Sequence, residues 1–180
     1  MRLLFVNQHY WPDVAATGQH LTDLAEHLAG EGFDVEVLTS RARYGGGELE
    51  APTRETRRGV GIRRTRVPGF GRSGDLGHLG RVLDYLAFLV PALWHVVTAD
   101  RYDAVVYLTT PPLLPVLGLL ANALRGQPYG IWSMDLHPEA EEALGVFPED
   151  ARYADLLQEL ADAAYRGAEF VVDLGPVMKR

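Results

Sequence analysis

Residues 130–145 of this chain, GIWSMDLHPEAEEALG, carry an aspartate, a histidine and a glutamate at alternating positions after an apolar run. The apolar run predicts a buried strand, so Asp135, His137 and Glu139 would lie in the loop that leaves its carboxyl end. Ligands of open α/β sheets bind at that edge. A carboxylate there could act as a general base or orient a hydroxyl group, and the imidazole could share a proton or bind a phosphate.

Two other interpretations of this loop stay open. The alternation of Asp135, His137 and Glu139 also suggests a metal site, but the chain shows no second pair of ligands at a recognised spacing. We therefore expect no metal. Alternatively, Asp135 caps the segment that follows, His137 lies at the surface and Pro138 sets a turn.

The loop after the first predicted strand, NQHYWPDVAATGQH, is a second candidate site. His9, Tyr10 and Trp11 could contact a substrate there, although the aromatic pair could equally pack against a neighbouring loop. Gly18 could let backbone N–H groups approach an anion at the start of the first helix. Because this loop has no GxGxxG pattern, a dinucleotide site has weak support.

A third candidate loop follows the fourth predicted strand and begins with Thr109 and Thr110, before Pro111 and Pro112. The two hydroxyl groups could bind a ligand. They could also simply cap the helix that comes next, because threonine is a favoured N-cap residue.

These loops need a scaffold, and the chain predicts one in which strands and helices alternate. Apolar runs and β-branched residues predict strands over 3–6, 34–39, 60–67, 104–109, 129–133 and 169–174. Apolar residues at helical spacing predict helices over 21–30, 80–99, 113–124 and 150–166. This alternation predicts a Rossmann-like, doubly wound α/β fold, with a mainly parallel sheet of about six strands and helices on both faces. The usual strand order for six strands is 3-2-1-4-5-6.

Length and composition narrow the class of protein. The 180 residues suit one domain with a full hydrophobic core, so we expect a single domain over 1–180. The chain has no cysteine, which excludes disulfides, thiolate ligands and cysteine nucleophiles and fits a reducing cytoplasm. The apolar run at the N-terminus is too short for a signal peptide or a membrane span.

The charges are distributed unevenly along the chain. Residues 41–81 hold ten arginines against four acidic residues, a charge of about +6 in a chain whose net charge is -7. Such a segment could face nucleic acid, anionic lipid or a phosphorylated substrate, or it could be a solvated, mobile loop with one exposed strand face. We expect no nucleic acid, because the rest of the chain is acidic and no aromatic residues interleave with the arginines.

The most apolar segment is 82–98, VLDYLAFLVPALWHVVT. It is too short for a clean membrane span, and it contains Asp84, Pro91 and His95. It could be an ordinary buried helix. It could also pack on the sheet and touch a membrane interface through its remaining apolar surface.

Several blocks, taken in order, resemble a known family. They are NQHYWPD, Gly18 in the first helix, EHLAGEGFDVEVLTS, YLTTPPLLPVLGLLA, WSMDLHPEAEEALG and FVVDLGPVMKR. Together they are similar to the N-terminal half of a GT-B glycosyltransferase, and more narrowly to the family-4-type transferases of bacterial exopolysaccharide, O-antigen and colanic-acid-like pathways. The similarity extends over all 180 residues, and the TTPP and DLHPE blocks are its most specific parts.

The resemblance implies one half of a GT-B fold, in which two Rossmann-like domains face each other across a cleft. The C-terminal domain, absent from this chain, would hold most of the donor site, and the final GPVMKR looks like the start of a further helix. The implied reaction is retaining transfer of a sugar from a nucleotide-diphosphate donor to a glycan acceptor, often linked to polyprenyl diphosphate, with no cofactor and no metal. The Gly18 loop would lie near the donor phosphates.

The resemblance also assigns roles to residues. Residues 135–139 match the D-L-x-P-E block of the family, which makes Asp135 the candidate catalytic residue. His137 stands where relatives often have tryptophan, and Met134 stands where many have histidine. The candidate substrate-binding residues are His9, Tyr10, Trp11, Gly18, Thr109, Thr110, His137 and Glu139.

The setting that follows is a cytoplasmic protein, with peripheral contact at the inner face of the cytoplasmic membrane through 82–98 as an added possibility. An alternative function stays open, in which the chain is a free-standing Rossmann-like binding or interaction module without catalysis of its own. A downstream domain with two spaced glutamates would favour the transferase.

Overall fold

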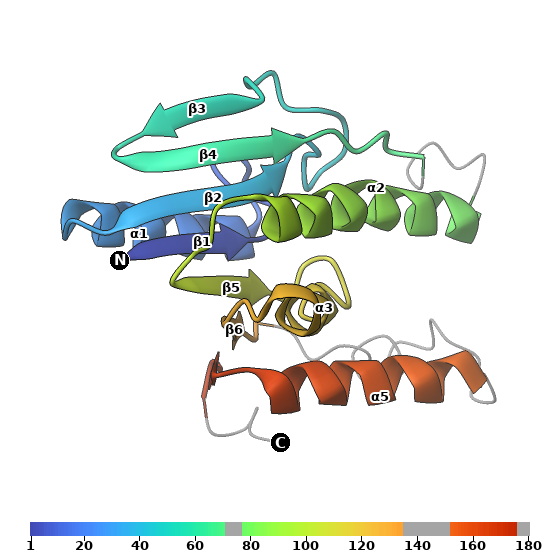
Figure 1. Ribbon diagram of the computed structural model, residues 1–180. Helices are drawn as coiled ribbons and strands as arrows, with labels where there is room; N and C mark the ends of the chain where they lie inside the picture. Colours follow the sequence, from blue (N-terminus) through green and yellow to red (C-terminus); the bar gives the residue numbers. More distant parts are fainter. Residues whose placement is uncertain (71–76, 135–151, 176–180) are drawn as a thin grey trace.

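The computed structural model describes residues 1–70, 77–134 and 152–175 (Figure 1). Three predicted site residues, Asp135, His137 and Glu139, lie outside the described residues.

One seven-stranded sheet forms the centre of the molecule, with the order β3-β4-β2-β1-β5-β6-β7 (Figure 1). The strands are β1 (Arg2–Val6), β2 (Asp34–Ser40), β3 (Arg54–Arg57), β4 (Val60–Thr65), β5 (Ala104–Leu108), β6 (Tyr129–Trp132) and β7 (Phe170–Val172). All neighbouring pairs are parallel except β3 and β4. The six parallel strands, numbered by themselves, have the predicted order 3-2-1-4-5-6.

The antiparallel edge strand β3 is a correction to the predicted sheet, because the sequence indicated only a loop there. Its residues RETR include no apolar side chain, so the pattern of a buried strand is missing. A two-residue turn joins β3 to β4, and both turn residues have positive φ, 47° at Arg58 and 84° at Gly59. This combination is typical of a hairpin turn that matches the twist of the sheet.

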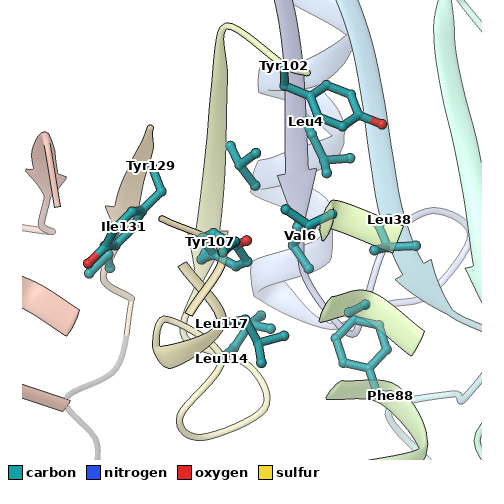
Figure 2. Packing of buried hydrophobic residues seen from close by; sticks show 14 of the residues in the cluster. Leu4, Val6, Leu38, Phe88, Tyr102, Tyr107, Leu114, Leu117, Tyr129 and Ile131 are labelled. Carbon is teal, nitrogen blue, oxygen red and sulfur yellow. The ribbon is translucent and has the colours of Figure 1, made fainter. Parts of the chain in front are cut away.

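Helices cover both faces of the sheet, as predicted. Figure 1 shows α1 (Ala16–Gly30) behind the sheet, and α2 (Gly77–Thr98), α3 (Val116–Arg125) and α5 (Arg152–Gly167) in front of it. Leu21 and Ala25 of α1 are buried in a core cluster on one face. Phe88 of α2 and Leu117 of α3 belong to the cluster on the other face (Figure 2). The prediction of a doubly wound α/β fold is confirmed.

The helix α3 begins three residues later than predicted. Leu113 has a φ of 64°, in the left-handed region, so the α-helix cannot run through this position. The residue before the helix is Pro115, and no side chain caps the helix N-terminus. The hydroxyl groups of Thr109 and Thr110 therefore do not serve as its caps.

A polar cluster lies between the last turn of α2 and β2. The hydroxyl of Tyr102 donates a hydrogen bond of 2.9 Å to Glu36 Oε2, and His95 Nε2 lies 3.0 Å from that hydroxyl oxygen. Arg63 Nε donates to Glu36 Oε1 at 3.2 Å. Burial raises the pKa of Glu36, but the hydrogen bonds from these partners outweigh it and lower the pKa to about 2.

Candidate functional site

A cavity of about 580 Å³ opens at the carboxyl edge of the parallel strands. The loops after β1, β2, β4 and β5 form its walls together with the first half of α2. Its lining includes Gln8, His9, Tyr44, Arg66, Arg81 and Thr110. This is the edge at which open α/β sheets bind ligands, because the strand-end loops diverge there.

Gln8 fixes the floor of the cavity through its backbone. Its N–H donates to the carbonyl of Thr110 at 2.9 Å, and its carbonyl accepts from the Ser40 N–H at 3.1 Å. The hydroxyls of Thr39 and Ser40 also donate to that carbonyl, at 3.0 and 2.8 Å. One residue thus joins the ends of β1, β2 and β5, so the floor is rigid.

His9 and Asp13 lie in the loop after β1 and hold the next wall in place. His9 Nδ1 is 2.7 Å from Asp13 Oδ2, and both side chains are buried. Asp13 also accepts hydrogen bonds from the backbone N–H groups of Val14 at 2.9 Å and Tyr44 at 2.9 Å. The Tyr44 ring meets the His9 ring edge to face, with centroids 5.7 Å apart. The carboxylate therefore links the loops after β1 and β2.

Asp84 links two other parts of the cavity wall, the loop after β4 and the helix α2. This buried carboxylate of α2 accepts hydrogen bonds from the N–H groups of Gly69 at 2.8 Å and Phe70 at 2.9 Å. Hydrogen bonds to a carboxylate are stronger than those between neutral groups. The loop after β4 is thus fixed to the helix that lines the cavity.

Five of the described arginines in the Arg-rich segment pair with acidic residues, unlike those of a freely solvated loop. The ion pairs are Arg41 with Glu48, Arg57 and Arg58 with Glu26, Arg63 with Glu36, and Arg64 with Glu55. Arg64 is buried and also donates to the Trp11 carbonyl at 2.9 Å. Arg66 and Arg81 differ from these residues, because both line the cavity.

Of the candidate residues in the first loop, His9 lines the cavity, whereas Tyr10 and Trp11 pack elsewhere. Tyr10 is 1% exposed and belongs to the core. Its burial raises its pKa to about 12, against the opposing effect of Arg57. The Arg57 guanidinium lies over the Trp11 ring, 4.3 Å from its centroid. In the structure, Tyr10 and Trp11 thus pack against other residues of the chain, which is the second of the two interpretations given above.

Gly18 is buried in the first turn of α1 and lies against the backbone of the preceding loop. A Cβ atom at this position would lie 3.1 Å from the His9 carbonyl carbon and 3.2 Å from the Tyr10 nitrogen. Glycine therefore allows the helix to approach the loop that carries His9. This close packing gives Gly18 a structural role beside the predicted contact with an anion.

Thr109 and Thr110 have different surroundings. Thr110 lines the cavity. Thr109 is buried, and its Oγ1 accepts a hydrogen bond of 3.2 Å from the backbone N–H of Met134. Since Met134 directly precedes Asp135, Thr109 holds the start of the loop that carries the candidate catalytic residue.

Sequence reasoning missed Gln8, Asp13, Asp84 and the separate position of Arg66 and Arg81. The only available signal for Gln8 was its position directly after the first strand. The partners of Asp13 and Asp84 are backbone N–H groups of other loops, which no motif encodes. Nothing distinguishes Arg66 from its neighbours except that β4 ends at Thr65.

The sheet order and the cavity at its carboxyl edge define a Rossmann-like α/β domain. The glycosyl transferase 4-like domain matches residues 16–180, and the chain belongs to this family. The resemblance to a GT-B half of the family-4 type is thereby confirmed. A comparison with curated proteins found no match. Membership implies, at a coarse level, transfer of a sugar from a donor to a glycan acceptor.

Proposed function

We propose that the chain is the acceptor-side domain of a retaining glycosyltransferase. The donor is a nucleotide-diphosphate sugar, and the acceptor is a glycan on polyprenyl diphosphate, in the synthesis of cell-surface polysaccharide. The observation that carries the proposal is the cavity of about 580 Å³ on four strand-end loops of a chain from this family. A second Rossmann-like domain supplies most of the donor site.

In this reaction, the acceptor hydroxyl oxygen forms a bond to the anomeric carbon, and the bond from that carbon to the diphosphate breaks. The leaving diphosphate takes the proton of the acceptor hydroxyl, so no separate base and no metal is required. Positive charge develops on the sugar ring in the transition state. Asp135 stabilises this charge or orients the sugar hydroxyls, because a carboxylate placed beside developing positive charge lowers the barrier. His137 and Glu139 contact the substrate from the same loop.

The described residues support this role through the fixed start of the loop. The hydrogen bond from Met134 N–H to Thr109 holds the backbone one residue before Asp135. In addition, the hydroxyls of Ser133 and Tyr165 are 2.9 Å apart, which joins this strand end to α5. Positioning of this kind matters because transfer rates depend steeply on the placement of reacting groups.

The test is transfer by the protein expressed together with any coding sequence downstream of Arg180. A panel of nucleotide sugars is incubated with soluble prenyl-diphosphate-linked monosaccharides, and products are identified by mass spectrometry and NMR. We expect an acceptor larger by one sugar, with the anomeric configuration of the donor. The isolated 180-residue chain, as a control, should fold but transfer nothing. Absence of transfer from the whole panel would favour the free-standing binding module.

We also propose peripheral contact with the inner face of the cytoplasmic membrane through α2. Among the described residues, one helical segment, Leu79–Thr98, is long and apolar enough to cross a membrane. However, Phe88, Ala92 and Val96 of this helix are fully buried in the core. The opposite side exposes large apolar side chains, including Val90 and Trp94, which are 61% and 71% exposed.

This division suits a helix that lies in the interface rather than one that spans the bilayer. One face packs on the sheet, and the other offers a continuous apolar stripe, Leu79, Val82, Leu83, Leu86, Val90 and Trp94. Exposed apolar patches rimmed by polar residues mark interaction sites, and Trp is favoured at the level of the lipid headgroups. A lipid-linked acceptor would be reached at that surface.

A further inference from the structure

Two arginines in the cavity wall have no partner in the described residues. Arg66 directly follows β4, and Arg81 lies near the start of α2. Both side chains are exposed, both line the cavity, and neither makes an ion pair or a hydrogen bond within the described ranges. The hydrogen bonds from Gly69 and Phe70 to Asp84 hold the loop that follows Arg66 against the helix that carries Arg81.

The acidic residues of the same wall are already engaged. Glu48 Oε1 lies 3.0 Å from Arg41 Nε, so its charge is balanced by that guanidinium. Asp84 accepts two backbone hydrogen bonds. Neither Arg66 nor Arg81 forms an ion pair with these acids among the described residues, and two unpaired guanidinium groups in one cavity wall favour an anionic occupant.

The floor of the cavity contributes an independent observation. Gln8 is 7% exposed, yet its side-chain amide makes no hydrogen bond within the described residues. Its backbone is fixed by four hydrogen bonds, so the side chain is held in position at the floor. Gln8 lines the cavity, so its amide N–H groups are available to a ligand oxygen there.

We propose that Gln8, Arg66 and Arg81 bind the diphosphate group of a substrate. Guanidinium groups match phosphate oxygens with paired hydrogen bonds, and a neutral amide donor completes the site without adding charge. The proposal rests on the proposed function, in which both substrates contain a diphosphate. The shared chemistry thus has two sources, the lipid-linked acceptor and the nucleotide-sugar donor.

The position of α2 favours the acceptor as the source. Arg81 and Tyr85 of this helix line the cavity, while Val82 and Leu86 belong to its exposed apolar stripe. Successive residues of an α-helix are rotated by about 100°, so the cavity wall and the apolar stripe are adjacent faces of one helix. A diphosphate in the cavity would leave a prenyl chain beside that stripe.

Binding to the 180-residue chain tests the proposal. Farnesyl diphosphate, inorganic diphosphate and a nucleotide sugar are titrated by calorimetry against the wild type and the variants Arg66→Gln, Arg81→Gln and Gln8→Leu. Each arginine variant should weaken binding of farnesyl diphosphate about tenfold, the usual effect of losing a charge-assisted hydrogen bond. Arg54→Gln is the matched control, because Arg54 is an exposed arginine of the same segment outside the cavity.

The outcomes separate this site from the proposed function. Unchanged affinity in both arginine variants, with their folding confirmed by thermal unfolding, would overturn the site. Arginine-dependent binding of the nucleotide sugar alone would support a diphosphate site but overturn its assignment to the acceptor.

In a protein that transfers sugar, the variants should raise KM for the acceptor only, and an unchanged acceptor KM would overturn the site while leaving the transferase intact. If the protein binds diphosphate through the arginines but transfers no sugar, the site would be supported and the proposed transferase function would be overturned.

Discussion

His9 and Asp13 form a buried pair in the loop after β1, with Nδ1 of the imidazole 2.7 Å from Oδ2 of the carboxylate. The side chain of Asp13 also accepts hydrogen bonds from the backbone N–H groups of Val14 and Tyr44. Asp13 thereby fixes the orientation of a ring that lines the cavity and the position of the loop after β2.

The first prediction concerns this carboxylate. Asp13→Ala should lower the free energy of unfolding by about 3 kcal/mol, because buried donors lose a charged acceptor. Urea unfolding at pH 7 measures the change. Asp23→Ala on the exposed face of α1 is the control and should change the free energy of unfolding by less than about 0.5 kcal/mol. Equal effects of the two substitutions would contradict the linking role of Asp13.

The second prediction concerns the packing of α1 against the loop. Gly18→Ala should destabilise the domain by about 1 kcal/mol or more, because the new Cβ meets backbone atoms at 3.1 and 3.2 Å that cannot move independently. This loss is expected despite the higher helix propensity of alanine. Gly30→Ala, in the last turn of the same helix, meets nothing within 4 Å and should be neutral or stabilising. Thermal unfolding of the two variants tests the contrast, and stabilisation by Gly18→Ala would refute it.

The third prediction follows from the low pKa of Glu36, about 2 in the folded state against 4.5 as the ordinary value. Because folding lowers this pKa, ionised Glu36 stabilises the domain above about pH 4.5, and that contribution is lost as the pH falls toward 2. Its size is about 3 kcal/mol.

Glu36→Gln should therefore lower the free energy of unfolding most at pH 7, and the difference from wild type should shrink between pH 4.5 and 2.5. Urea unfolding at a series of pH values measures this difference. Glu50→Gln, at an exposed position, is the control. A difference between wild type and Glu36→Gln that is independent of pH would show that Glu36 does not carry this linkage.

The parallel strands and their order could be predicted because each has an apolar run of its own and the crossover rules leave few arrangements. The edge strand β3 could not be predicted in this way. Its RETR sequence is stabilised by pairing with β4 and by ion pairs, which a hydrophobic pattern does not reveal.

The candidate site was predictable only as a set of loops. The sequence places His9 and Thr110 after strands, and the structure brings both to one cavity. The sequence does not indicate that Tyr10, next to His9, is in the core, because an aromatic residue suits both a core and a binding site. Whether an arginine pairs with an acid or faces the cavity depends on contacts between distant segments, as for Arg64 and Arg66.

The fourth prediction concerns the candidate catalytic residue of the proposed transferase. Asp135→Asn should lower kcat by at least about a hundredfold, because removing one electrostatic contact to the transition state has effects of that size. Thermal stability should change little by comparison. Product formation at saturating donor and acceptor gives kcat, and differential scanning fluorimetry gives the melting temperature. Activity within a few-fold of wild type would exclude a catalytic role for Asp135.

The last prediction concerns the exposed stripe of α2. The double substitution Val90→Glu and Trp94→Glu places two charges in the apolar surface, at side chains that are 61% and 71% exposed and so not needed for the core. Burying charges at an interface is unfavourable, so binding to vesicles with anionic lipid should fall at least about tenfold. Flotation of the chain with vesicles measures binding, and circular dichroism checks the fold.

The control is the double substitution Leu156→Glu and Leu174→Glu, at exposed apolar side chains outside α2. Equal loss in both double variants would mean that the membrane contact is not specific to α2, and full binding by the α2 variant would rule that contact out.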